Sequence, residues 1–66
     1  MSKNNPAAFL TTGEVATRLR VTTGTVRRWR LDDVGPRFLQ VGAIYRYPLR
    51  DLEEWISERV RNSLAS

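Results

Sequence analysis

The sequence contains neither cysteine nor histidine among its 66 residues. Without these two residues the chain forms no disulfide, holds no zinc finger, and lacks the thiol and imidazole on which most nucleophilic catalysis depends. A small secreted scaffold relies on such staples, so the composition argues against that class. The serines and threonines have no histidine to activate them, and the adjacent carboxylates Glu53 and Glu54 diverge on a helix. We therefore expect no enzyme, no catalytic residue, no bound metal and no cofactor.

Long apolar runs are missing too. No stretch approaches the ~20 residues of a membrane span, and residues 1–5, Met-Ser-Lys-Asn-Asn, do not look like a signal peptide. We expect a soluble cytoplasmic protein with no membrane partner. A chain of 66 residues makes at most one small domain, with no deep cleft for a small-molecule substrate.

Basic residues, in contrast, are abundant. Eleven lysines and arginines face seven acids, and the sequence pI is about 10.7. All but Lys3 are arginine, whose planar fork holds phosphate or guanine through two hydrogen bonds. Residues 14–30 contain five arginines and one acid, whereas residues 51–58 contain four acids and no base. Such a division favours one face built for an anionic polymer.

Capping and apolar patterns predict two short helices joined by a tight turn. The run Thr11-Thr12-Gly13-Glu14 is a capping box, and the apolar stripe after it predicts a helix over 12–19. After a break, Thr22 or Thr23 supplies a second N-cap for a helix over 23–31. Together they form a candidate helix-turn-helix.

The second half of the chain predicts a hairpin and a third helix. β-forming residues over 36–47 are interrupted by Gly42-Ala43, and Pro48 then begins a helix over 49–62. We expect a mostly α fold with a small β-hairpin, a winged helix-turn-helix. The expected boundaries are a disordered arm over 1–8, one domain over 9–62 and a tail over 63–66.

The second predicted helix has one apolar edge and one cationic edge. Val26 and Trp29 are expected to face the core, shared with Leu10, Val15, Leu19, Leu52, Trp55 and Ile56. At about 100° per residue the opposite edge carries Gly24, Arg27, Arg28 and Leu31. Arg30 lies to one side. A cationic exposed edge suits a helix that enters the major groove, and a solvated helix face is the alternative interpretation.

Several strings resemble the small winged-helix domain shared by phage excisionases and MerR-like regulators. They are Leu10-Thr11-Thr12-x-Glu14-Val15-Ala16, Val21-Thr22, Thr25-Val26-Arg27-Arg28-Trp29, Gly35-Pro36-x-Phe38, Gly42, Arg46-Tyr47 and Asp51-Leu52-x-x-Trp55. The resemblance covers about residues 9–57. It implies a recombination directionality factor that bends attachment-site DNA, binds it cooperatively and directs the integrase toward prophage excision. The implied partners are double-stranded DNA, the phage integrase and neighbouring copies of the chain, in a bacterial host cell.

The resemblance also implies individual roles. The base-contacting arginine would be Arg28, with Arg27 beside it. Positions where some excisionases carry an acid, a later arginine and a basic wing tip are occupied here by Gly24, Leu31 and Ala43. We therefore expect few base contacts and a larger share of affinity from phosphates and DNA shape.

These arguments select three groups of candidate DNA contacts. In the recognition helix they are Thr23, Gly24, Thr25, Arg27, Arg28 and Arg30. Backbone contacts are expected from Arg18, Arg20 and Thr22. The wing contributes Arg37, Ala43, Tyr45 and Arg46, although a salt bridge from Arg46 to Asp51 or Glu54 is an equal alternative.

Two other functions stay open on the sequence alone. One is a small phage or plasmid transcriptional regulator of the same fold. The other is a protein–protein adaptor that works through the acidic third helix.

Overall fold

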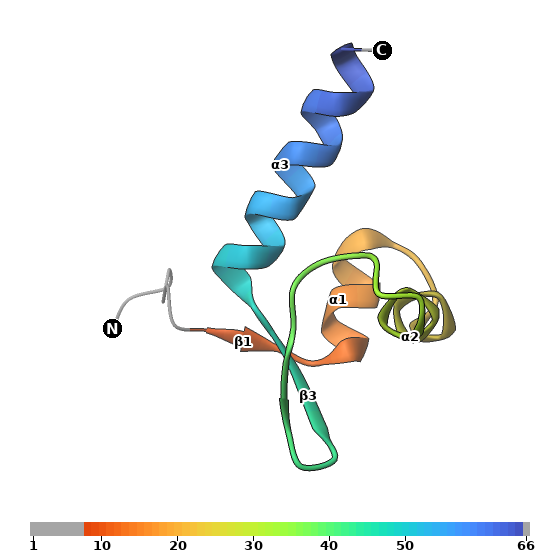
Figure 1. Cartoon of the computed structure of the whole chain (residues 1–66), viewed down its shortest axis with the longest axis vertical. Coiled ribbons are helices and arrows are strands. Elements are labelled where there is room, and N and C mark those ends of the chain that lie inside the picture. Colours follow the sequence, from red (N-terminus) through yellow and green to blue (C-terminus); the bar gives the residue numbers. More distant parts are fainter. Residues whose placement is uncertain (1–7, 66) are drawn as a thin grey trace.

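A computed structural model describes residues 8–65, which form three helices and a three-stranded antiparallel sheet (Figure 1). The elements are, in chain order, β1 (Phe9–Leu10), α1 (Thr12–Leu19), α2 (Thr23–Leu31), β2 (Leu39–Val41), β3 (Ile44–Pro48) and α3 (Leu49–Ala65). The expected disordered arm lies outside the described residues, except for Ala8. Its carbonyl accepts a hydrogen bond from the Leu49 amide at 2.9 Å.

Helices α1 and α2 begin and end where the sequence predicts. The capping box of α1 is formed, because the Thr11 hydroxyl accepts from the Glu14 amide at 3.0 Å and the Glu14 carboxylate accepts from the Thr11 amide at 2.9 Å. Thr22 caps α2 and accepts from the Thr25 amide at 3.2 Å. Between the helices Arg20 takes a left-handed conformation, with φ of 59°, which turns the chain sharply. The two helices therefore meet in a tight turn fixed by local bonds.

The sheet has the order β1-β3-β2, so β3 pairs with both neighbours. The hairpin turn is Gly42-Ala43, flanked by the pair Val41 and Ile44. Gly42 has a φ of 62°, which glycine adopts without strain at the first central position of a two-residue turn. Strand β1 is not anticipated by the sequence analysis, since a two-residue strand is too short to show alternation.

The core lies between the sheet and the helices. Its buried members are Val15, Ala16, Val26, Tyr47 and Leu52, and around them pack Leu10, Leu19, Val21, Trp29, Phe38, Trp55 and Ile56. This confirms the predicted shared core, and the rings of Trp29 and Trp55 lie 5.5 Å apart. Tyr47, which the sequence marks only as a β-former, is 1% exposed.

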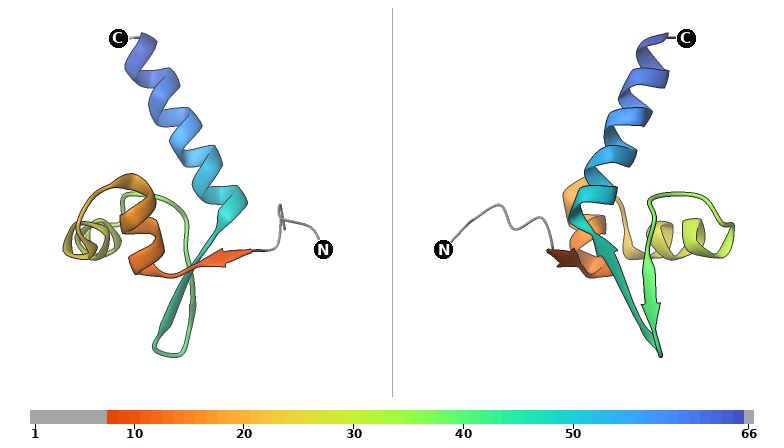
Figure 2. Two further views of the ribbon diagram at one scale, coloured as in Figure 1. Left: turned by 180° about the vertical axis from the view of Figure 1, so that it is seen from behind. Right: turned by 60° about the vertical axis from the view of Figure 1, so that its left-hand side comes forward.

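Helix α3 is longer than predicted. It continues through Ala65 instead of ending at Asn62, so the expected tail over 63–66 is helical as far as it is described. Its later turns project away from the body (Figure 2). The spacing of Leu52, Trp55, Ile56 and Val60 predicts one apolar face, but Val60 is 53% exposed and lies outside the core. Arg59 and Arg61, which the predicted end at Asn62 puts in the last turn, precede it in the longer helix. No glycine or proline marks the end of this helix in the sequence, so the boundary had no local signal.

The elements make up a winged helix-turn-helix. Helices α1 and α2 form the helix-turn-helix, β2 and β3 form the wing, and α3 packs its first turns against β3. The wing and the end of α3 project in opposite directions from the body (Figures 1 and 2). Among residues 8–65 no helix combines the length and apolar character needed to cross a membrane.

Candidate nucleic-acid interface

Helix α2 presents its cationic edge to solvent, as the sequence predicts. Val26 is fully buried and Trp29 packs on the core, which fixes the rotation of the helix. Arg27 and Arg28 are exposed on the opposite edge. Leu31 follows on the same edge and is 79% exposed. The buried edge thus dictates which side chains an approaching molecule meets.

The first turn of α2 is open. A Cβ atom placed on Gly24 would meet nothing nearer than the Thr22 hydroxyl, at 3.8 Å. That hydroxyl lies 3.0 Å from the Thr25 hydroxyl, so both are engaged in the cap. Thr23 is exposed beside them. The start of the helix therefore offers a smooth surface with polar atoms, over the positive end of the helix dipole.

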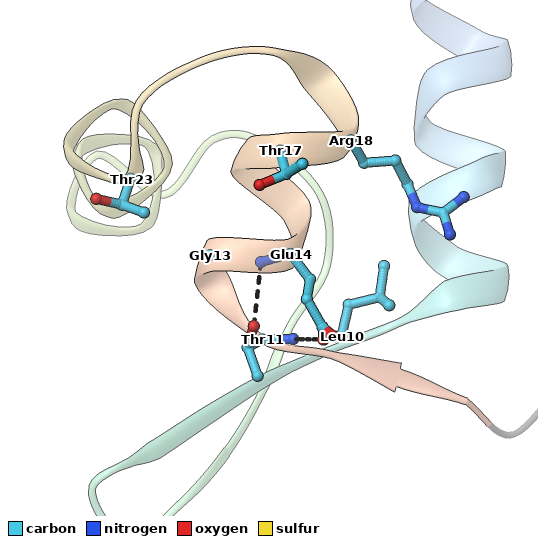
Figure 3. A pocket seen from close by; sticks show the side chains of 7 residues that line it. All are labelled: Leu10, Thr11, Gly13, Glu14, Thr17, Arg18 and Thr23. Carbon is cyan, nitrogen blue, oxygen red and sulfur yellow. Dashed lines mark hydrogen bonds between the residues drawn. The ribbon is translucent and has the colours of Figure 1, made fainter.

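A shallow hollow lies next to this turn (Figure 3). It is lined by Leu10, Thr11, Gly13, Glu14, Thr17, Arg18 and Thr23. Thr17 and Thr23 face it from the two helices of the motif, while the Arg18 guanidinium extends on the side of α3, away from Thr23. Arg18 and Arg20 are both exposed, one on α1 and one in the turn. The predicted backbone contacts are thus spread around the motif and not gathered at one point.

Arg28 has an acidic neighbour. Its Nε atom lies 3.4 Å from the carboxylate of Asp32, the residue that follows α2 as its C-cap. The two side chains are 73% and 55% exposed, so the pair contributes little to stability. Asp32 therefore pairs with Arg28 only weakly and leaves its guanidinium exposed. A phosphate or a base edge could take the place of the carboxylate.

Arg30 is placed differently from Arg27 and Arg28. One nitrogen of its guanidinium, Nη1, donates to the Thr12 hydroxyl and to the Tyr47 hydroxyl, both at 3.1 Å. The centre of the guanidinium lies 3.8 Å from the centroid of the Tyr45 ring. The side chain is half-buried between α2, α1 and β3 and points away from the exposed arginine edge.

The wing carries little charge at its tip. Ala43 lies in the turn, and the exposed side chains next to it, Val41 and Ile44, are apolar. Tyr45 is half-buried beneath Arg30 and meets the edge of Phe38, with ring centroids 5.8 Å apart. The wing therefore offers mainly shape and backbone to a partner.

The two wing arginines lie away from the tip. Arg46 donates through Nη1 to the Tyr45 carbonyl at 2.8 Å, and no salt bridge joins it to Asp51 or Glu54 in the described part of the chain. Arg37 precedes β2 and lines a shallow cleft with Asp51 and Glu54 of α3. Of the two alternatives for Arg46, the salt bridge is not formed among the described residues, and Arg46 bonds to the backbone instead. Arg37 lies beside acids.

The sequence reasoning missed the residues that hold Arg30. Thr12 was considered only as part of a capping box, and Tyr47 only as a β-former. The signal available was the alternation of Tyr45 and Tyr47, which puts both rings on one face of a strand. Their common partner, from α2, could not be inferred from that alternation.

Comparison with known families identifies the architecture. The family model described as a helix-turn-helix domain matches residues 9–60. The chain belongs to the helix-turn-helix domain family. This family includes excisionase-like small DNA-binding proteins, and double-stranded DNA is the partner that membership implies for this helix-turn-helix protein. No curated protein matches the sequence.

Proposed function

We propose that this helix-turn-helix protein is a sequence-specific, DNA-bending excisionase. It binds phage attachment-site DNA cooperatively and directs the integrase toward prophage excision. The observation that carries the DNA-binding part is the exposed edge of α2, where Arg27 and Arg28 follow an open first turn at Gly24. The strings shared with excisionases support the finer assignment.

In this proposal α2 lies in the major groove and Arg28 reads a base. An arginine binds the O6 and N7 atoms of guanine through two hydrogen bonds, which requires an exposed guanidinium on an outward edge. Arg28 meets that requirement at 73% exposure. Arg27 and Thr23 flank it, while Arg18, Arg20 and Thr22 contact phosphates.

The role of Arg28 can be tested on a site selected from random DNA. Arg28→Ala should lose about 1–3 kcal/mol of discrimination between the selected site and random DNA. The matched control, Arg20→Ala, should weaken binding to both DNAs about equally, because a phosphate contact carries no sequence information. Equal losses on both DNAs for Arg28→Ala would demote Arg28 to a backbone contact.

Recombination itself is the decisive assay. Purified integrase from the same genome is incubated with a plasmid carrying the two prophage attachment sites, with and without this protein. Excision that depends on the protein supports the excisionase assignment. Specific binding without any effect on excision would instead favour a small transcriptional regulator, with which the helix-turn-helix family match agrees equally well.

A further inference from the structure

We propose that Arg30 is a positioning residue, which fixes the wing relative to the recognition helix and does not itself contact DNA. The inference rests on the proposed function, because it assumes that α2 and the wing bind one DNA molecule together. It assigns Arg30 a different role from its neighbours Arg27 and Arg28, although all three were first grouped as contacts.

The guanidinium of Arg30 is held in both direction and plane. Nη1 carries two hydrogens, and both have acceptors, the hydroxyls of Thr12 and Tyr47. The flat face of the group rests on the Tyr45 ring at 3.8 Å. Stacking on an aromatic face adds a cation–π attraction, which is stronger where water is partly excluded. A side chain tied in this way does not turn outward to a phosphate without giving up all three contacts.

The three partners lie on two other elements. Thr12 is the first residue of α1, whereas Tyr45 and Tyr47 lie on β3, the inner strand of the wing. Helix α2 packs mainly against α1, and β3 packs against α1 and α3. Arg30 therefore links α2 directly to the wing strand, and its contacts restrict the angle between these two elements.

On the wing strand, the link is anchored by the buried side chain of Tyr47. It is 1% exposed, and its hydroxyl accepts from Arg30. Tyr45 is supported in turn by the edge of Phe38. A buried anchor and a supported ring leave the wing little freedom to tilt while Arg30 is in place.

Lysine cannot replace arginine in this arrangement. A lysine ammonium keeps the positive charge and has three donors for the two hydroxyls, but it is shorter and has no planar group to stack on the Tyr45 ring. A simple phosphate contact would tolerate that exchange far better. Arg30→Lys therefore separates a positioning role from a charge contact.

The test combines a measurement without DNA and one with DNA. Residual dipolar couplings in the free protein report the orientation of the hairpin amides relative to those of α2. In the wild type the couplings of the hairpin and of α2 should fit one alignment tensor, as in a rigid body. In Arg30→Lys and in Tyr47→Phe the hairpin couplings should fit a separate, weaker tensor than those of α2. Arg27→Lys, on the exposed edge, is the matched control and should leave the single alignment unchanged. Thermal melts confirm that each variant is folded. If Arg30→Lys does not fold, Tyr47→Phe still tests the link, because it removes only the hydroxyl and keeps the buried ring.

Binding is then measured on the selected site over a range of salt concentrations. Loss of the ring stacking in Arg30→Lys, and of the hydrogen bond to a charged group in Tyr47→Phe, should each weaken site binding by about tenfold. The slope of affinity against salt should stay as in the wild type, and the footprint under the wing should fade before that under α2.

Two results would overturn the proposal. One is a single rigid alignment in every variant. The other is near wild-type binding by Arg30→Lys and Tyr47→Phe together with a salt slope reduced by about one in Arg30→Ala, as a phosphate contact requires. If the wild type binds no DNA, the proposed function fails, and the dipolar couplings still decide whether Arg30 holds the wing.

Discussion

At the scale of single residues, two glycines differ in what a side chain would meet. Gly35 has a φ of 87°, and a Cβ atom there would lie 3.0 Å from the Trp29 Cβ and 3.2 Å from its ring. At Gly24 a Cβ atom would make only an ordinary van der Waals contact, with the Thr22 hydroxyl at 3.8 Å. Gly35 is therefore needed for the fold, because the chain turns tightly there past a core tryptophan. Gly24 is not needed for packing, and its missing side chain leaves the surface of α2 open.

Alanine substitutions should separate these two roles. Gly35→Ala should lower the free energy of unfolding by about 1–3 kcal/mol, through backbone strain and a clash with Trp29. Gly24→Ala should leave it unchanged or raise it by about 0.5 kcal/mol, because alanine suits a helix better. The same methyl group should weaken DNA binding by standing between the helix and the groove. Urea denaturation and a titration with DNA measure both effects, and an unchanged Kd for Gly24→Ala would show that no close approach occurs there.

In the proposed complex the Asp32 carboxylate competes with DNA for Arg28. Removing its charge in Asp32→Asn should tighten DNA binding by about 0.2–1 kcal/mol, the range of an exposed ion pair. Asp33→Asn removes the same charge one residue away, where Asn tolerates the φ of 58°, and is the matched control. A larger gain for Asp32→Asn in fluorescence anisotropy would implicate the pair, whereas equal gains would reduce the effect to net charge.

At the scale of elements, local signals decided what could be predicted. The bounds of α1 and α2 follow from Thr11 and Thr22, whose caps involve residues three positions away. Strand β1 depends on pairing with β3, far along the chain, so the strand was not predicted. Helix α3 was predicted, but its end was not, because no stop signal marks it. The same reasoning applies to the site: the exposed edge of α2 follows from periodicity, but the inward turn of Arg30 depends on contacts with α1 and β3.

The packing of α2 on α3 rests on two tryptophans. The Trp29 and Trp55 rings meet at 5.5 Å with a tilt of 46°. Trp29→Ala should therefore cost about 3–5 kcal/mol, which is most of the stability of a small domain. Leu31→Ala, on the same helix but 79% exposed, should change stability by no more than about 0.5 kcal/mol. Thermal melts followed by far-ultraviolet circular dichroism compare the two, and a Trp29→Ala protein with unchanged melting would contradict the observed packing.

At the scale of the whole molecule, exposed side chains of both signs are available for contacts between copies of the chain. Arg18 and Arg20 lie exposed on α1 and in the turn, and Glu53 and Glu58 lie exposed on α3. Exposed charges of both signs on one molecule allow head-to-tail contacts, which extend along a polymer instead of closing into a ring. In the proposed function DNA supplies such a polymer, since one winged helix-turn-helix would read only a few base pairs and would gain specificity from neighbours on adjacent sites.

We therefore expect a monomer in free solution and a ladder of cooperative complexes on DNA that carries several repeats of the site. Gel shifts on fragments with one, two and three repeats should show stepwise bands, each formed more readily than the last, and circular permutation should show bending. The double variant Glu53→Gln, Glu58→Gln should lose the cooperativity while keeping its affinity for a single repeat, because the proposed assembly sets these acids against the neighbouring copy and not against the DNA. Gln preserves the size of both side chains, so a change in fold is not expected. A single complex on unbent DNA, or a ladder unaffected by the double variant, would contradict head-to-tail assembly and favour a regulator that binds one site.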